Sequence, residues 1–114
     1  MKAINKTKNT VVAAQINIAD SFVSRLKGLL GETDLPAGHG LAIKGCNSIH
    51  MFFMRFAIDA IFTDKNNQVV GLVENIKPFR LSPIFFKAHL VVELPAGTIQ
   101  ESKTELGDQI NFED

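Results

Sequence analysis

Cys46 and His50 are the pair whose types and spacing best suit nucleophilic chemistry. A cysteine attacks as the thiolate, and a neighbouring imidazole can accept its proton. On an ideal β-strand Cys46, Ser48 and His50 share one face, because successive side chains alternate between faces, and Arg55 then lies on the opposite face. Catalysis also requires an exposed thiolate of low pKa. We therefore favour the interpretation of Cys46 as a small buried hydrophobe and of His50 as a hydrogen-bonded strand residue.

Asp59 is a second candidate, because it interrupts the apolar run 57–62. A carboxylate in such a strand either faces solvent or is buried with a partner, since an unpaired buried charge is very costly. Arg55 and Arg25 are the expected partners, because a guanidinium can hold a carboxylate at two points. We favour a structural ion pair among these three residues. The alternative is a ligand pocket, whose candidate residues are Cys46, Ser48, His50, Arg55 and Asp59.

No metal, cofactor or phosphate site is expected. The candidate metal ligands lack the close-spaced pairs that structural zinc sites use; they are His39, His50, His89 and Cys46. The glycines at residues 38, 40 and 45 lack the spacing of a phosphate-binding loop.

Composition narrows the classes of partner. Twelve basic and twelve acidic residues give a formal net charge of zero, and the basic residues cluster only at Lys2, Lys6 and Lys8. Nucleic-acid binding depends on clustered Lys and Arg, so this role is not expected. The single cysteine suits a reducing compartment, and neither a signal peptide nor a membrane span is evident, which predicts a cytoplasmic location. We expect a monomer or weak dimer.

The elements that must position these residues are mostly short strands. Alternating or apolar runs predict strands at residues 10–18, 41–43, 49–54, 57–63, 69–73 and 90–94, and after Gly107-Asp108. The turn at 64–67 predicts a hairpin. Helical spacing of Phe22, Leu26 and Leu29 predicts one helix at residues 20–30, and Thr98 with Glu101 predicts a capping box on a single helical turn. The chain is thus predicted to be one mainly β domain, residues 1–114, with residues 1–9 frayed. Its fold would be a small β-sandwich or flattened barrel of seven to eight strands.

Two further features concern burial. His89 and Glu93 share one face of their strand, which we expect to be the wetter face. The apolar run 84–86 lies in a loop framed by Pro78 and Pro83. We expect it to pack onto the core, and the alternative is a sticky surface or the lip of an apolar pocket.

Several motifs in fixed order carry a family resemblance. They are Arg25 with Gly28-Leu29, Gly40-Leu41, Cys46-x-Ser48-Ile49-His50-Met51-Phe52-Phe53-Met54-Arg55, Ile58-Asp59 with Ile61-Phe62, Glu93-Leu94-Pro95-Ala96-Gly97, and Gly107-Asp108. Over residues 20–112 the chain resembles the bacterial and archaeal family called domain of unknown function 192 (DUF192), also known as UPF0127. Many members have a Phe-Trp-Met segment at the Ile-His-Met-Phe-Phe-Met position, and many carry an export signal. The resemblance implies a β-rich fold and no activity.

Two functions from different classes remain. The first is a non-enzymatic binding or accessory module that holds a partner protein or small ligand near His50, Arg55 and Asp59. The second is a hydrolase or thiol-transferase with Cys46 as nucleophile and His50 as base. Neutral charge, small size and the lack of a compact catalytic set favour the binding module.

Overall fold

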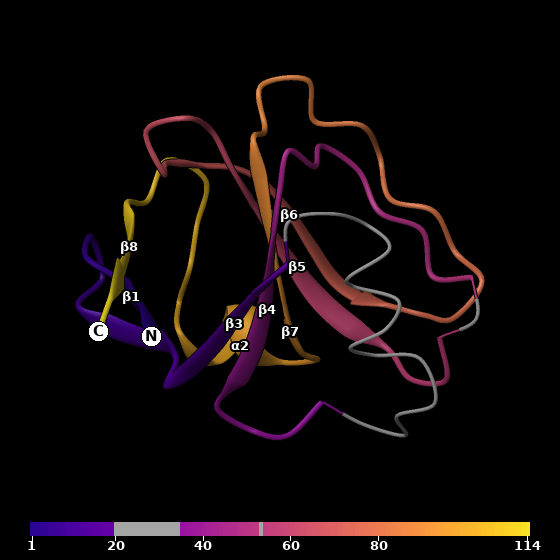
Figure 1. Cartoon of the computed structure of the whole chain (residues 1–114), viewed down its shortest axis with the longest axis horizontal. Coiled ribbons are helices and arrows are strands. Elements are labelled where there is room, and N and C mark those ends of the chain that lie inside the picture. Colours follow the sequence, from indigo (N-terminus) through magenta and orange to yellow (C-terminus); the bar gives the residue numbers. More distant parts are fainter. Residues whose placement is uncertain (20–34, 53) are drawn as a thin grey trace.

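The computed structural model describes residues 1–19, 35–52 and 54–114, and these residues are mainly β (Figure 1). Helix α2 is a single short turn at Thr98–Glu101. The strands are β1 (Lys2–Asn5), β2 (Thr10–Ala13), β3 (Gln15–Ala19), β4 (His39–Lys44), β5 (Ile58–Thr63), β6 (Val69–Ile76), β7 (Leu90–Pro95) and β8 (Ile110–Glu113). In the part of the chain described here, no helix is long and apolar enough to cross a membrane.

The eight strands of the described residues confirm the mainly β prediction; they form two sheets and do not close into a barrel. One sheet has three strands in the order β2-β1-β8, and the other has five in the order β3-β4-β7-β5-β6. All pairs are antiparallel except β3 with β4, which run parallel. The hairpin predicted at residues 64–67 joins β5 to β6, where Asp64 Oδ1 accepts the backbone N–H groups of Asn66 and Gln68.

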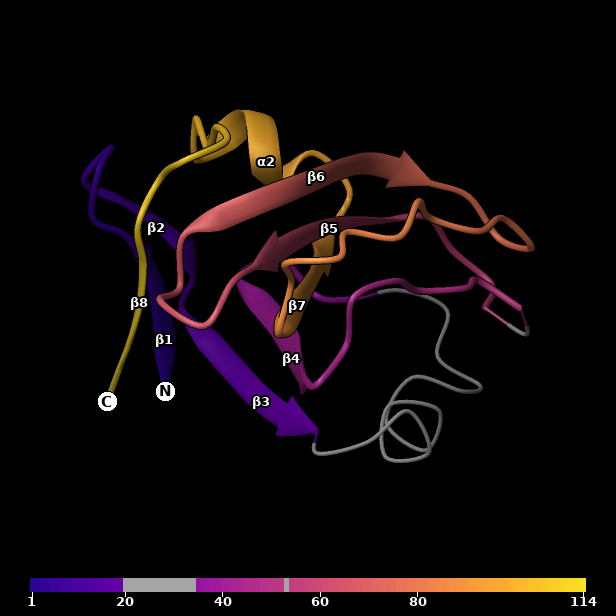
Figure 2. The same ribbon diagram turned by 90° about the horizontal axis from the view of Figure 1, so that it is seen from above.

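The prediction that residues 1–9 are frayed is wrong. Strand β1 is the middle strand of the smaller sheet and pairs with both β2 and β8. Ala3 and Asn5 are both fully buried. The two chain ends therefore lie beside each other at one end of the molecule (Figures 1 and 2).

The single strand predicted at residues 10–18 is divided between the two sheets. The backbone N–H groups of Ala14 and Gln15 both donate to the carbonyl oxygen of Gly38, which marks the point of division. Strand β2 stays in the small sheet, while β3 joins β4 in the large one. The alternation of the sequence predicts that the even positions 12–18 face the core. It holds for Val12 and Ile16 and fails for Ala14 and Ile18, which are exposed.

Two apolar clusters cover the two faces of the five-stranded sheet. The cluster between the sheets joins Ala3 and Val12 to Ile61 and Val92. The cluster on the other face contains Phe62 and Val91 together with residues from the loops. Every residue of β5 is buried, because this strand is covered on both faces.

Two long segments form the end of the molecule opposite the chain termini (Figures 1 and 2). We call them the first loop (residues 45–57) and the second loop (residues 77–89). They run side by side, with backbone hydrogen bonds from Phe79 to Met51 and from Ser82 to Ile49, and an antiparallel bridge between His50 and Leu81. The strand predicted at 49–54 is therefore a loop whose apolar side chains reach the core: Ile49, Met51 and Met54 are buried.

Two helical predictions have different outcomes. The helix predicted at residues 20–30, which includes Arg25, lies outside the described residues. A helical turn is present at Thr98–Glu101, but without the predicted capping box. The Thr98 hydroxyl instead donates to the carbonyl oxygen of Pro95 at 2.7 Å.

Candidate functional site

Asp59 is fully buried, and its carboxylate is held by backbone amides. Oδ1 accepts the N–H of Asn75 at 2.8 Å, and Oδ2 accepts the N–H groups of Gly97 at 3.1 Å and Ile99 at 2.9 Å. Gly97 is the N-cap of α2, so Asp59 supplies from β5 the acceptor that a capping side chain would otherwise provide. The register between β5 and β6 also shifts beside Asp59, so that Glu74 and Asn75 together stand opposite it, and the carboxylate accepts the amide of Asn75.

The predicted ion pair between Asp59 and Arg55 is not formed. Arg55 is exposed on the first loop, and no salt bridge joins it to Asp59. A carboxylate that accepts three backbone amides is already satisfied, so it does not require a guanidinium. Asp59 therefore anchors the start of α2 and the end of β6 to β5.

Cys46, Ser48 and His50 lie on the first loop, where no regular strand fixes a common face. The half-buried Cys46 thiol donates to the backbone carbonyl oxygen of Ser48 at 2.8 Å. This contact is with a backbone carbonyl oxygen, which is not the base that a nucleophilic thiol requires. His50 Nδ1 accepts the backbone N–H of Phe52 at 3.3 Å, and the two rings lie 4.9 Å apart.

A pocket between the two loops contains two of the predicted site residues. It has a volume of about 280 Å³ and is lined by Ser48, Ile49, His50, Leu81, Ser82 and Ile84. Three of these side chains are apolar and three are polar. Ser82 Oγ holds the two walls together, because it accepts the N–H of Ile49 at 2.8 Å and donates to the carbonyl oxygen of Pro83 at 2.9 Å. We call this the loop pocket.

Residues 84–86 divide between core and surface. Phe85 packs on the fully buried Phe62 with ring centroids 4.6 Å apart, so it follows the core prediction. Ile84 and Phe86 are 55% and 85% exposed. Ile84 instead follows the alternative prediction, the lip of an apolar pocket, since it lines the loop pocket.

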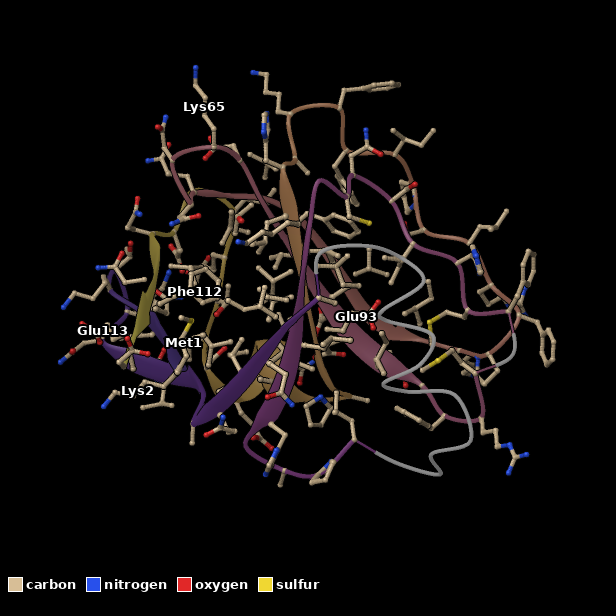
Figure 3. The ribbon with its side chains drawn as sticks, viewed as in Figure 1. Met1, Lys2, Lys65, Glu93, Phe112 and Glu113 are labelled. Atoms are coloured by element: carbon tan, nitrogen blue, oxygen red, sulfur yellow. The ribbon has the colours of Figure 1, made fainter. Side chains whose placement is uncertain are left out.

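Glu93 is the polar residue that the sequence interpretation placed wrongly. It is fully buried, opposite Leu41 and Ala60 on neighbouring strands, and lies in the interior of the molecule (Figure 3). Its strand is central and covered on both faces, so neither face is wet. The signal that could have revealed this is the apolar character of its whole strand, Leu90–Pro95.

A separate polar network stabilises the other end of the molecule. The carboxylate of Asp108 accepts hydrogen bonds from Asn5 Nδ2 at 2.9 Å and from Lys8 Nζ at 2.9 Å. Burial raises the pKa of Asp108, but the hydrogen bonds from Asn5, Lys8 and the Glu105 N–H outweigh it, so the pKa lies below its ordinary value. Hydrogen bonds to Glu105 and Asp108 raise the pKa of Lys8. The network joins β1 to the turn before β8 and is structural.

No group of three or more His, Cys, Asp or Glu side chains that could hold a metal ion occurs within residues 1–19, 35–52 and 54–114. The geometry defines a mainly β domain of two sheets, in which one anchored carboxylate braces the fold and two loops enclose a small pocket.

The sequence assigns this domain to a family. The model of DUF192, described as an uncharacterized ACR, matches residues 3–112, and the chain belongs to this family. The UPF0127 protein of Thermococcus sibiricus is 36% identical over 96% of this chain and 73% of its own length. The UPF0127 protein PH1112 of Pyrococcus horikoshii is 35% identical over 96% of both chains. The family has no characterised activity.

Solved structures share the fold. A protein of unknown function from Novosphingobium aromaticivorans has a TM-score of 0.81 and 19% identity, covering 96% of this chain and 82% of its own. A protein from Sinorhizobium meliloti 1021, described as a candidate transcription regulator, has a TM-score of 0.75 and 19% identity, covering 96% of this chain and 89% of its own. At this identity the likeness concerns the fold alone.

Proposed function

We propose that this protein is a non-enzymatic binding module, and that its ligand site is the loop pocket. The observation that carries the proposal is the composition of that pocket, where Ile49, Leu81 and Ile84 face the same space as Ser48, His50 and Ser82. Ligand sites are typically apolar cavities with a few convergent polar groups. Arg55 and Asp59 do not take part in the proposed site.

The volume limits the ligand. At about 280 Å³ the pocket is close to the lower end of the range for small-molecule sites. A compact molecule with an apolar body and one hydrogen-bonding group fits its chemistry. The apolar body would pack on Leu81 and Ile84, and the polar group would lie against His50 or Ser48.

Titration of the labelled protein with a library of small aromatic carboxylates, amides and alcohols tests this proposal. We expect saturable shifts of the backbone N–H resonances of Ser48, Ile49 and His50, with a dissociation constant of about 1 mM or tighter for the best compounds. Ile84→Trp should abolish these shifts by filling the pocket, since Ile84 is 55% exposed and tolerates a larger side chain. Leu106→Trp is the matched control, because Leu106 is 66% exposed and outside the loops. The proposal would be refuted if no compound shifted these resonances in the parent, or if the same shifts persisted in Ile84→Trp.

A cytoplasmic location is a further part of the proposal. It is supported by the single, half-buried cysteine, because disulfides persist in oxidising compartments and are rare in the cytosol. Fractionation of cells that express the natural gene with a C-terminal epitope tests it, and recovery from outside the cytoplasm would contradict it.

A further inference from the structure

The two loops expose an unusual amount of large apolar surface. Nine large hydrophobic side chains are exposed in the described part of the chain, and five of them lie on these loops. We call these five the apolar loop surface: Phe52 (40% exposed), Phe79 (68%), Leu81 (68%), Ile84 (55%) and Phe86 (85%). Their backbones connect the two loops. Phe79 bonds to Met51, the neighbour of Phe52, and Leu81 and Ile84 line the same pocket. Phe86 follows Phe85, whose N–H donates to the carbonyl oxygen of Asn47 on the first loop.

The charged side chains that the two loops and the adjoining end of β4 carry have one sign. Every charged residue from 44 to 57 and from 77 to 89 is basic, although the whole chain has a net charge of zero. All five of these basic residues are exposed: Lys44, Arg55, Lys77, Arg80 and Lys87. Sequence reasoning missed this group, because its members are spread over two segments that only the fold brings together (Figures 1 and 2).

Phe79 has a backbone conformation that is rare for an aromatic residue. Its φ angle is 64°, in the left-handed region that a bulky side chain seldom adopts. This conformation is unfavourable, and burial of the ring does not offset it, because Phe79 is 68% exposed. An aromatic residue at such a position is consistent with a role in contact with something outside the chain.

We infer that the apolar loop surface docks onto anionic phospholipid bilayers, with its aromatic and aliphatic side chains at the acyl boundary and the five basic residues against the headgroups. Apolar loop residues flanked by Lys and Arg match the two contributions that hold a peripheral protein at such an interface. Each basic residue near an anionic surface increases binding roughly fivefold. The occupant is a bilayer rather than a nucleic acid, because the surface combines aliphatic Leu81 and Ile84 with its phenylalanines. An acyl boundary accepts both kinds of side chain, whereas base stacking uses aromatic rings alone.

This inference goes beyond the small-molecule site and does not depend on it. Phe79 and Phe86 are outside the loop pocket, so their replacement leaves its lining intact. Bilayer docking and occupation of the pocket can therefore fail separately.

Sedimentation with unilamellar vesicles tests the inference. The full chain should bind vesicles of mixed phosphatidylcholine and phosphatidylserine at least tenfold more strongly than vesicles of phosphatidylcholine alone. Binding should weaken as added salt shortens the screening length from about 30 Å at 0.01 M to about 8 Å at 0.15 M. Absence of binding to the anionic vesicles, or equal binding to both kinds, would overturn the inference.

Matched variants test which residues are responsible. Phe79→Asn should reduce vesicle binding at least tenfold and leave the unfolding midpoint unchanged or higher, because Asn tolerates positive φ. Phe86→Ser should also weaken binding, whereas Leu106→Ser removes a comparably exposed side chain outside the loops and should have no effect. Joint replacement Lys77→Glu with Arg80→Glu should abolish binding, and Lys6→Glu with Lys103→Glu should preserve it. Equal effects of loop and control variants would overturn the inference, and so would tighter binding of a single-stranded oligothymidylate than of the anionic vesicles.

Discussion

Replacement of Asp59 by Asn tests the central structural assignment most directly. The carboxylate is fully buried and accepts three backbone N–H groups at 2.8–3.1 Å. Asn keeps one carbonyl oxygen, which can serve the amides of Gly97 and Ile99. Its NH₂ group then faces the Asn75 N–H, and because both groups are donors, that hydrogen bond is lost. The two remaining hydrogen bonds, from Gly97 and Ile99, then end on a neutral oxygen instead of a carboxylate.

The expected loss follows from these three bonds. A hydrogen bond to a charged group contributes about 1.5–3 kcal/mol, and a buried donor without a partner costs about 1–3 kcal/mol. We therefore expect Asp59→Asn to lower the free energy of unfolding by about 2–4 kcal/mol, a large part of the ~5–15 kcal/mol typical of a domain. Urea denaturation, monitored by circular dichroism, measures this loss. The dependence of the unfolding free energy on urea concentration should be the same for variant and parent.

Two controls make the result specific. Asp64 also accepts two backbone amides, but in the exposed hairpin turn, so Asp64→Asn should cost about 1 kcal/mol or less. Arg55→Ala combined with Asp59→Asn should be additive within about 0.5 kcal/mol, because the two side chains do not interact. A loss below about 1 kcal/mol for Asp59→Asn would refute the role of Asp59 as an anchor. A strong departure from additivity with Arg55→Ala would support the ion pair instead.

Three other substitutions or treatments have definite expected outcomes. Gly71→Ala should cost about 1–3 kcal/mol in urea denaturation, because a Cβ on Gly71 would overlap the Phe85 ring; an unchanged midpoint would show that Phe85 moves freely. The difference in unfolding free energy between the parent and Asp108→Asn should be largest near neutral pH and shrink below about pH 4. The pKa of Asp108 is lower in the folded protein than its ordinary value of 3.8, so its contribution to stability is lost as the pH falls through the folded pKa. A difference that does not change with pH would contradict the network. Cys46 should react with iodoacetamide at neutral pH about tenfold more slowly than free cysteine, since its thiol is half-buried and donates to Ser48; faster reaction would favour the nucleophile hypothesis.

Asp59 illustrates what sequence could and could not predict about the site. The apolar run around it left two placements, on the solvent face or buried with a partner, because an unpaired buried charge is very costly. The structure shows the second placement for Asp59. Its partners did not follow, since they are backbone amides 16, 38 and 40 residues further along the chain. Every residue except proline carries a backbone amide, so no side-chain type marked them, and the nearby Arg55 attracted the prediction instead.

The fold class was predictable for a similar local reason, and its details were not. Alternation and turn residues identified most strands, because those patterns depend on neighbours in sequence. The run 49–54 has the apolar content of a strand, yet Ile49, Met51 and Met54 reach the core from a loop. Glu93 was placed on a wet face because its charge was given more weight than the apolar residues of the rest of its strand, which are the local sign that both faces are covered.

The position of β1 has a consequence for synthesis of the protein. Strand β1 leaves the ribosome first of the eight strands, but its partner β8 leaves last, and the two are paired from Lys2 opposite Glu113 to Asn5 opposite Ile110. Until β8 emerges, the nascent β1–β2 hairpin presents an unpaired edge to its surroundings. The paired residues are separated by almost the whole length of the chain, so the formation of this pair is a slow, non-local step. Until that pair closes, the free edge of β1 is a point at which neighbouring nascent chains can associate.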